Sequence, residues 1–296
     1  MLQVRARGKV NWTLDVLGQL PNGYHDLDML LSSVTLCDLL EFRESEELTL
    51  TVNSAGQSFA PADDKNLVLR AARLLREETG VKVGADIKLK KYIPVCAGMG
   101  GGSSDAAATL LALNMMWKCG LTPDELSSLG LRIGADVPFC LKGGLCRVKG
   151  IGETVMPLRM GKPVHLVAIQ PCRGLSTKEV FDGLHTEGIA EEDRPDSDLA
   201  ASALETGDIR TLSRAMGNVL QPVSIRKRPR LRQAIQALRD SGAMAAQMTG
   251  SGSVVYGIYP NAQKCREAMI ALQMQYPSAR AMLTADSGVE IVEAET

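Results

Sequence analysis

The residues best suited to chemistry lie in one glycine-rich segment, Pro94 to Asp105, which reads PVCAGMGGGSSD. Four glycines in the five positions 98–102 permit unusual backbone angles and leave no side chains in the way. Backbone N–H groups can then turn inward at the positive end of the following helix, an arrangement that binds phosphate. The residues expected to contribute are Pro94, Gly98, Gly100, Gly101, Gly102, Ser103 and Ser104.

Two common phosphate motifs do not match this segment. A P-loop needs a lysine after its last glycine, and here Ser103 follows Gly102 directly. A dinucleotide fingerprint that starts at Gly98 would need glycine at position 103. A tight turn with Ser103 or Ser104 as helix N-cap also explains the residues, so both interpretations stay open at this point.

A candidate general base is Asp136, within the segment GADVPF at 134–139. A carboxylate among small and apolar neighbours at a proline turn can accept a proton from a substrate hydroxyl. Aspartate is also common in Asx turns and at helix ends, and the residues alone favour that role.

Tyr24 and His25 stand together in the segment NGYHDL at 22–27. An aromatic face and a ring nitrogen suit recognition of a nucleobase. Aromatic residues make up only 4% of the chain, so an aromatic side chain without a specific role is less expected at Tyr24. For His25, a turn histidine bonded to the backbone is the alternative.

The sequence of the first half predicts the strand and the helix that position the glycine-rich segment. Ile87, Leu89 and Tyr92 alternate with lysines and predict a strand before it, while Ala107, Leu110, Leu111 and Trp117 predict a helix after it. Thr122, Pro123 and Glu125 predict a capping box. The other expected elements are strand-rich segments at 4–17 and 30–42 with a turn at 21–23, a strand at 48–52, and a helix at 66–79 ended by Gly80.

A second unit is predicted from about residue 162. We expect strands at 165–170, 254–259 and 279–284, the last of these being the final strand, and helices at 178–184, 198–216, 231–239 and 262–274. The acidic residues between 187 and 196 predict an exposed loop, and the basic run at 226–230 a solvated loop and first helical turn. The pattern favours an α+β sandwich, with domains at 1–160 and 161–296.

Five motifs, taken in order and spacing, resemble those of the GHMP kinases, small-molecule kinases whose glycine-rich loop differs from the P-loop. The motifs are GKVN at 8–11, NGYHDL at 22–27, GMGGGSSDAA at 98–107, GADVPF at 134–139 and TGSGSVVYG at 249–257. They bracket the chain from about residue 5 to about residue 260. The chain departs from the family at Arg7 and Gly8, where proline and alanine are usual, and at Met99, a near-isosteric replacement of leucine.

This resemblance implies an α+β fold with a ribosomal-protein-S5-like, ATP-binding N-terminal domain, a ferredoxin-like C-terminal domain on the substrate side, and a cleft between them. It implies that Asp136 takes the acceptor's proton and that Lys9 contacts both this carboxylate and the transferring phosphate. A cation there stabilises the carboxylate and the developing negative charge. ATP would be the phosphoryl donor, and Mg²⁺ would be held mainly through the ATP phosphates.

Within the family, the five motifs resemble the branch that phosphorylates the 2-hydroxyl of a cytidine-diphosphate methylerythritol in isoprenoid precursor synthesis. Tyr24 would then stack on cytosine and His25 would hydrogen-bond its edge. A different GHMP kinase, with a mevalonate- or homoserine-type substrate, and a non-catalytic ligand-binding member are the alternatives. Further expected contacts are Asn66 and Lys91 for ATP, and Asn11, Lys142, Phe181, Gly250, Ser251 and Gly252 for the substrate.

Composition limits the remaining possibilities. The chain has 296 residues and a net charge of −1, which gives no electrostatic reason to expect nucleic acid or an acidic membrane as partner. Its seven cysteines contain no CxxC pair, which favours reduced thiols in a cytoplasm over disulfides or a zinc site. No apolar run approaches membrane-span length, and no signal segment is apparent, so we expect a cytoplasmic protein, either a monomer or a homodimer.

Overall fold

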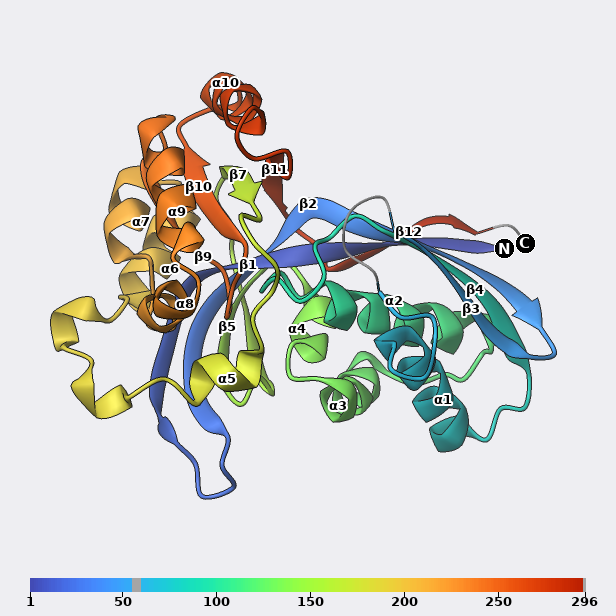
Figure 1. Cartoon of the computed structure of the whole chain (residues 1–296). Coiled ribbons are helices and arrows are strands. Elements are labelled where there is room, and N and C mark those ends of the chain that lie inside the picture. The colour runs from blue at the N-terminus through green and yellow to red at the C-terminus, as the bar shows by residue number, and fades with distance from the viewer. Residues whose placement is uncertain (55–59, 295–296) are drawn as a thin grey trace.

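Two long antiparallel strands cross the molecule and connect its two halves (Figure 1). They are β1 (Leu2–Gln19) and β2 (His25–Ser45), which form a hairpin with its turn at 21–23. The computed structural model describes residues 1–54 and 60–294. Strand β1 continues through Arg7 and Gly8 with a shift of its register against β2 between Arg7 and Lys9, and the Arg7 guanidinium pairs with Glu290.

The first half is a sheet with helices against one face (Figure 1). Its strands beside the hairpin are β3 (Leu48–Ser54), β4 (Gly84–Lys91), β5 (Leu145–Gly150) and β6 (Thr154–Leu158). Strands β4 and β5 both pair with β2, β3 pairs with β4, and β6 pairs with β5. The helices are α1 (Leu67–Thr79), α2 (Gly101–Met116), α3 (Pro123–Ile133) and α4 (Val137–Lys142).

The second half adds further strands to the same sheet and covers them with helices (Figure 1). The strands run in the order β11 (Arg280–Ala285), β7 (His165–Ile169), β10 (Val255–Tyr259), β9 (Ala245–Met248), and β11 pairs with β2. The two-residue β8 (Gly217–Asn218) pairs with β1. The helices are α5 (Thr177–Phe181), α6 (Ser197–Thr206), α7 (Ile209–Ala215), α8 (Gln221–Lys227), α9 (Arg230–Asp240) and α10 (Ala262–Gln273), with short 3₁₀ turns at Thr186–Gly188 and Glu191–Asp193.

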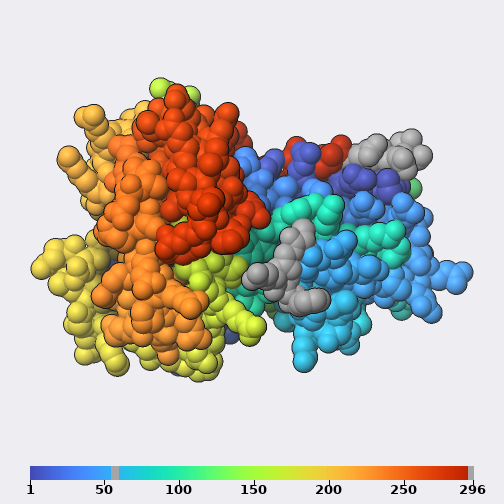
Figure 2. Space-filling view, turned by 45° about the horizontal axis from the view of Figure 1, so that its top comes forward, coloured from blue at the N-terminus to red at the C-terminus, as the bar shows by residue number. Residues whose placement is uncertain are grey.

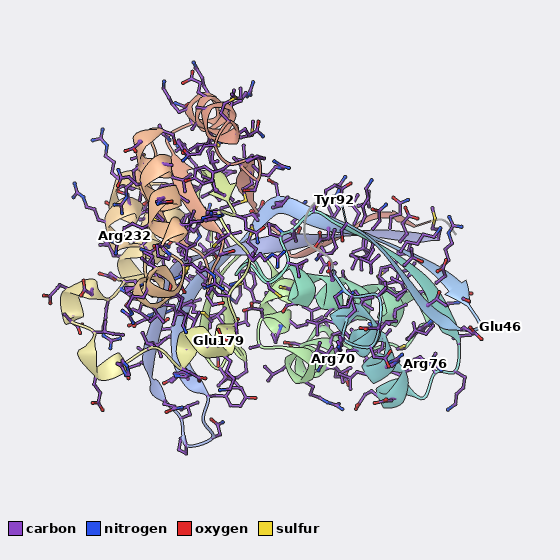
Figure 3. All side chains as sticks on the ribbon, in the orientation of Figure 1. Glu46, Arg70, Arg76, Tyr92, Glu179 and Arg232 are labelled. Carbon is purple, nitrogen blue, oxygen red and sulfur yellow. The ribbon has the colours of Figure 1, made fainter. Side chains whose placement is uncertain are left out.

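Figure 2 shows the two halves as adjoining masses, blue to green from the N-terminal half and yellow to red from the second. Apolar faces of sheet and helices form the core, where Trp12, Phe42 and Tyr256 are fully buried. Arg70 on α1 and Arg232 on α9 are exposed, which places the polar faces of these helices in solvent (Figure 3). None of the helices in residues 1–54 and 60–294 has the length and apolar character needed to cross a bilayer.

Local signals predicted several elements well. Asn66 caps α1 by accepting from the N–H of Val68, and Gly80 ends it at φ +71°. Thr122 and Glu125 form the predicted capping box of α3. The basic run at 226–230 is exposed as expected, and Arg230 begins α9, but the loop before it is only residues 228–229 because residues 226–227 end α8.

Two sequence expectations about elements are wrong, and one alternative that the sequence left open is not observed. The helix expected at 198–216 is two helices, because Gly207 adopts φ +75° and Asp208 caps α7. The strand near 279–284 is not the last, since β12 (Val289–Ala294) follows and pairs with β1. The serines do not cap α2, whose N-cap is Gly100 with no side-chain bond, and the Ser104 hydroxyl donates to the Arg7 carbonyl instead.

Candidate active site

A cleft of about 670 Å³ brings together most of the residues that the sequence singled out. It lies among the glycine-rich loop, the starts of α1 and α4, helix α5 and the 250–251 turn. Predicted residues that line it are Lys9, Asn11, Asn66, Lys91, Pro94, Gly98, Gly100, Gly101, Gly102, Ser103, Asp136, Phe181, Gly250 and Ser251.

Lys9 and Asp136 form a pair at this cleft. The Lys9 ammonium lies 3.8 Å from Asp136 Oδ2, and the two side chains are 5% and 33% exposed. Asp136 directly precedes α4, but its carboxylate makes no capping hydrogen bond in the described part of the chain. The carboxylate is therefore available to a ligand, which argues against the Asx-turn alternative.

Asn11 connects Lys9 to the 249–251 turn from the other end of the chain. Its Oδ1 accepts from Lys9 Nζ at 2.8 Å, from Gly250 N at 2.9 Å and from Thr249 Oγ1 at 3.1 Å. Three donors on one buried oxygen fix both the amide orientation and the position of the lysine ammonium.

The glycine-rich loop packs closely against the Thr249 backbone, where a side chain on Gly98 could not fit, and against the Lys9 side chain, which leaves little room at Gly100. Gly98 has φ +84°, and a Cβ there would lie 2.1 Å from the Thr249 carbonyl oxygen. Gly100 has φ +68°, and a Cβ there would lie 3.1 Å from Lys9 Cγ. Helix α2 begins directly after Gly100 without a side-chain cap, so its positive end and its first N–H groups are available to an anion.

Two residues expected on the nucleotide side have polar atoms already engaged. The Asn66 amide donates to the Pro61 carbonyl at 2.6 Å and accepts from Val68 N. The Lys91 ammonium lies 2.5 Å from Asp38 Oδ2 and 2.6 Å from Asp105 Oδ2. Both residues line the cleft, and these contacts hold each side chain in place, so their predicted contacts with nucleotide stay predictions.

On the side where we expect the substrate, the His25 ring lies next to that of Phe181, with centroids 4.9 Å apart and planes inclined by 39°. Tyr24 is 61% exposed at the tip of the β1–β2 hairpin. Five predicted residues, all within the described ranges, do not line the cleft: Ser104, Tyr24, His25, Lys142 and Gly252.

The cleft and the layer directly behind it also contain residues that the sequence did not single out; Thr177 and Asp105 line the cleft, whereas Thr249 is buried beside it. Thr249 donates to Asn11, and the Thr177 hydroxyl lies 3.0 Å from that of Ser251. Thr249 and Asp105 both belong to quoted motifs, so their place beside the glycines was an available signal.

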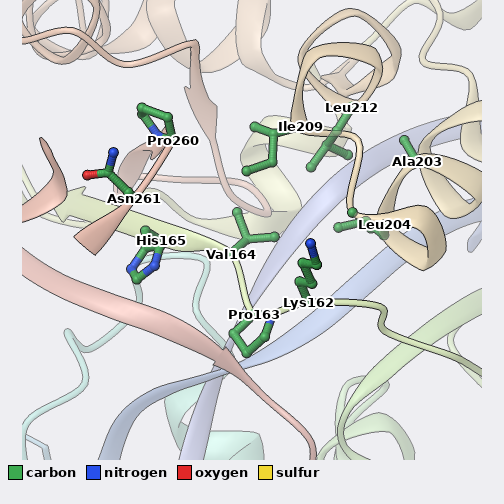
Figure 4. Close-up of a pocket in the computed structure, with 11 residues that line it drawn as sticks. Lys162, Pro163, Val164, His165, Ala203, Leu204, Ile209, Leu212, Pro260 and Asn261 are labelled. Atoms are coloured by element: carbon green, nitrogen blue, oxygen red, sulfur yellow. The ribbon is translucent and has the colours of Figure 1, made fainter. Parts of the chain in front are cut away.

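A second cavity, of about 200 Å³, lies away from these residues, between the starts of β7 and α10 and helices α6 and α7 (Figure 4). Its lining is mainly apolar, with Lys162, His165 and Asn261 as polar members, and it holds none of the predicted site residues. The chemistry therefore concentrates in the larger cleft.

The fold and the glycine-loop site together define a small-molecule kinase of the GHMP class. A family model described as the GHMP kinases N terminal domain matches residues 66–144, and one described as GHMP kinases C terminal matches residues 200–273. A protein of Alkaliphilus metalliredigens named 4-diphosphocytidyl-2-C-methyl-D-erythritol kinase is 38% identical over 275 residues, which cover 93% of this chain and 94% of the relative. A protein of the same name from Pelotomaculum thermopropionicum is 41% identical over 262 residues, which cover 88% of this chain and 90% of that protein.

The chain belongs to the 4-diphosphocytidyl-2-C-methyl-D-erythritol kinase family. A crystal structure of 4-(cytidine 5'-diphospho)-2C-methyl-D-erythritol kinase superposes with a TM-score of 0.82 at 31% identity, covering 96% of this chain and 99% of the other. A homoserine kinase from Cytophaga hutchinsonii superposes with a TM-score of 0.76 at 19% identity, which shows a shared fold alone. The predicted GHMP kinase fold and membership of the cytidine-diphosphate branch are thus confirmed.

Proposed function

We propose that this kinase transfers the γ-phosphoryl group of ATP to the 2-hydroxyl of 4-diphosphocytidyl-2-C-methyl-D-erythritol. The observation that carries the proposal is the Lys9–Asp136 pair at 3.8 Å beside the glycine-rich loop. A base, a cation and a phosphate-binding loop in one cleft are the parts that phosphoryl transfer requires.

In the proposed reaction, the Asp136 carboxylate accepts the proton of the acceptor hydroxyl. The hydroxyl oxygen forms a bond to the γ-phosphorus while the bond to the bridging oxygen breaks, and ADP leaves with that oxygen. Lys9 is held by Asn11 so that its charge stabilises the carboxylate before transfer and the phosphoryl oxygens during transfer. Backbone N–H groups at the start of α2 bind the ATP phosphates.

We propose that Mg²⁺ binds mainly through the ATP phosphates, where it neutralises their charge. The described residues contain no group of three or more His, Cys, Asp or Glu side chains arranged to hold a metal ion. Mg²⁺ usually binds through one or two carboxylates together with substrate phosphates, which supports an ion that arrives with the nucleotide. We place the reaction in the cytoplasm, where the seven unpaired cysteines would stay reduced.

The decisive experiment incubates the purified protein with ATP, Mg²⁺ and the cytidine-diphosphate substrate and measures ADP and the phosphorylated product. Homoserine and mevalonate serve as parallel acceptors, and Asp136→Asn serves as the control for contaminating kinases. Product from the cytidine substrate alone supports the proposal. Binding of both ligands without product would instead favour a non-catalytic member of the fold.

A further inference from the structure

Three buried charged side chains form an ion-pair triad next to the glycine-rich loop. The Lys91 ammonium lies between Asp38 Oδ2 at 2.5 Å and Asp105 Oδ2 at 2.6 Å. Their side chains are 5%, 0% and 3% exposed. Each residue comes from a different element, namely the end of β4, the middle of β2 and the start of α2.

The triad connects the two ends of the loop. Asp38 Oδ1 accepts from Tyr92 N at 2.5 Å and from Ile93 N at 2.9 Å, so this carboxylate fixes the chain where it leaves β4. Asp105 fixes the chain where it enters α2. Lys91 joins the two carboxylates and thereby closes the loop at its base.

The triad also lies directly against the loop's backbone. A Cβ on Gly101 would lie 3.3 Å from Lys91 Nζ and 2.9 Å from Ile93 Cγ2. A shift of Lys91 would therefore be transmitted to the first turn of α2, where the N–H groups for phosphate are placed.

The triad carries two carboxylates against one ammonium. Burial raises the pKa of the Asp105 carboxyl, Lys91 lowers it, and the nearby Asp38 carboxylate raises it further. Asp105 Oδ1 has no hydrogen-bond partner among residues 1–54 and 60–294. Removal of Asp105 would leave a balanced Lys91–Asp38 pair, so it need not expose an uncompensated buried charge.

We propose that Asp38, Lys91 and Asp105 are positioning residues that hold the glycine-rich loop in its nucleotide-binding conformation. Lys91 then acts on the nucleotide through the loop and not by the direct contact that the sequence predicted. The inference rests on the proposed binding of ATP phosphates by this loop. A loop that is competent for only a tenth of the time would bind nucleotide about tenfold more weakly.

The two roles of Lys91 predict opposite effects for Asp105→Ala. If Lys91 contacts nucleotide directly, loss of one competing carboxylate frees the ammonium and leaves ADP binding equal or tighter. If Lys91 positions the loop, ADP binding weakens, because the end of the loop that enters α2 is no longer fixed by Asp105. Asp105→Asn should restore most of the affinity, since its amide oxygen still accepts from Lys91.

The test measures ADP affinity by calorimetry and the hydrogen exchange of loop amides 95–104 in the ligand-free protein. For Asp105→Ala we expect about a tenfold higher dissociation constant and faster loop exchange, with unchanged affinity for the cytidine substrate. Asp28→Ala is the matched control, because Arg147 is likewise shared by two carboxylates, Asp28 at 2.7 Å and Asp198. This control should change neither ADP affinity nor loop exchange.

Unchanged or tighter ADP binding in Asp105→Ala, together with unchanged loop exchange, overturns the proposal. Equal effects of Asp105→Ala and Asp28→Ala on ADP affinity and loop exchange would also overturn it, since the loss of any ion pair would then produce the same result. If the wild-type protein does not bind ADP, the proposed function fails, while exchange in the ligand-free variants still shows whether the triad orders the loop.

Discussion

The contact between the two glycine motifs can be tested with one methyl group, in Gly98→Ala. A Cβ at this position would lie 2.1 Å from the Thr249 carbonyl oxygen and 3.0 Å from its carbon. These are backbone atoms, which cannot rotate away as a side chain does. The loops are also joined there by a hydrogen bond from Val254 N to the Ala97 carbonyl, at 3.0 Å.

The expected loss of stability has two parts. A left-handed backbone costs a residue with a Cβ about 1–2 kcal/mol, and forced separation of packed atoms costs about 1–3 kcal/mol more. Gly80→Ala isolates the first part, because Gly80 has φ +71° and nothing within 4 Å of the added Cβ. We therefore expect Gly98→Ala to lose about 1–3 kcal/mol more stability than Gly80→Ala.

Urea unfolding of both variants measures this difference, and steady-state kinetics measures its functional consequence. Gly98→Ala should raise the KM for ATP, because separation of the loops moves the phosphate site, whereas Gly80→Ala should leave that KM unchanged. Equal losses of stability in both variants and an unmoved KM for ATP in Gly98→Ala would show that the close contact does not shape the site.

Three further outcomes are expected. Asp136→Asn should lower kcat by about 10²–10⁴-fold while ADP affinity stays unchanged, and kinetics within a few-fold of wild type would remove Asp136 from the mechanism. Tyr24→Ala should weaken binding of the cytidine substrate by about 1–3 kcal/mol without lowering the melting temperature, because the side chain is 61% exposed; equal losses for ADP in calorimetry would contradict a stacking role. Asp105→Asn should gain melting temperature relative to wild type as the pH rises above about 4. Burial raises the pKa of the wild-type Asp105 carboxyl, so the wild-type protein loses stability as the pH rises from the ordinary aspartate pKa through this raised pKa. Melting temperatures of the two proteins that run parallel against pH would refute this.

Features encoded within a few residues could be predicted from the sequence. The caps of α1 at Asn66 and Gly80 and the capping box of α3 follow from local chemistry, and so does the glycine-rich turn before α2. Each of these depends on side chains that reach only the neighbouring backbone.

Features that depend on strand order could not be predicted in the same way. From the sequence, Lys91 is expected to face solvent or to bind a ligand. Only the pairing of β2 with β4 brings Asp38 next to it. Strand β12 was missed because its position beside β1 depends on a pairing across the whole chain. Charge partners 53 residues apart leave no periodic signal in the sequence.

The placement of Lys9, which we propose to act with Asp136, shows how local and long-range information combine. Lys9 and Asn11 are two positions apart on β1, so a strand turns both side chains to the same side, while Val10 between them is buried in the core. That much follows from the motif GKVN. The orientation of Asn11 depends on Gly250 and Thr249, more than 230 residues away. Since one oxygen receives donors from both ends of the chain, the lysine is correctly placed only when the two halves have come together, and the motif acquires its chemistry from the fold.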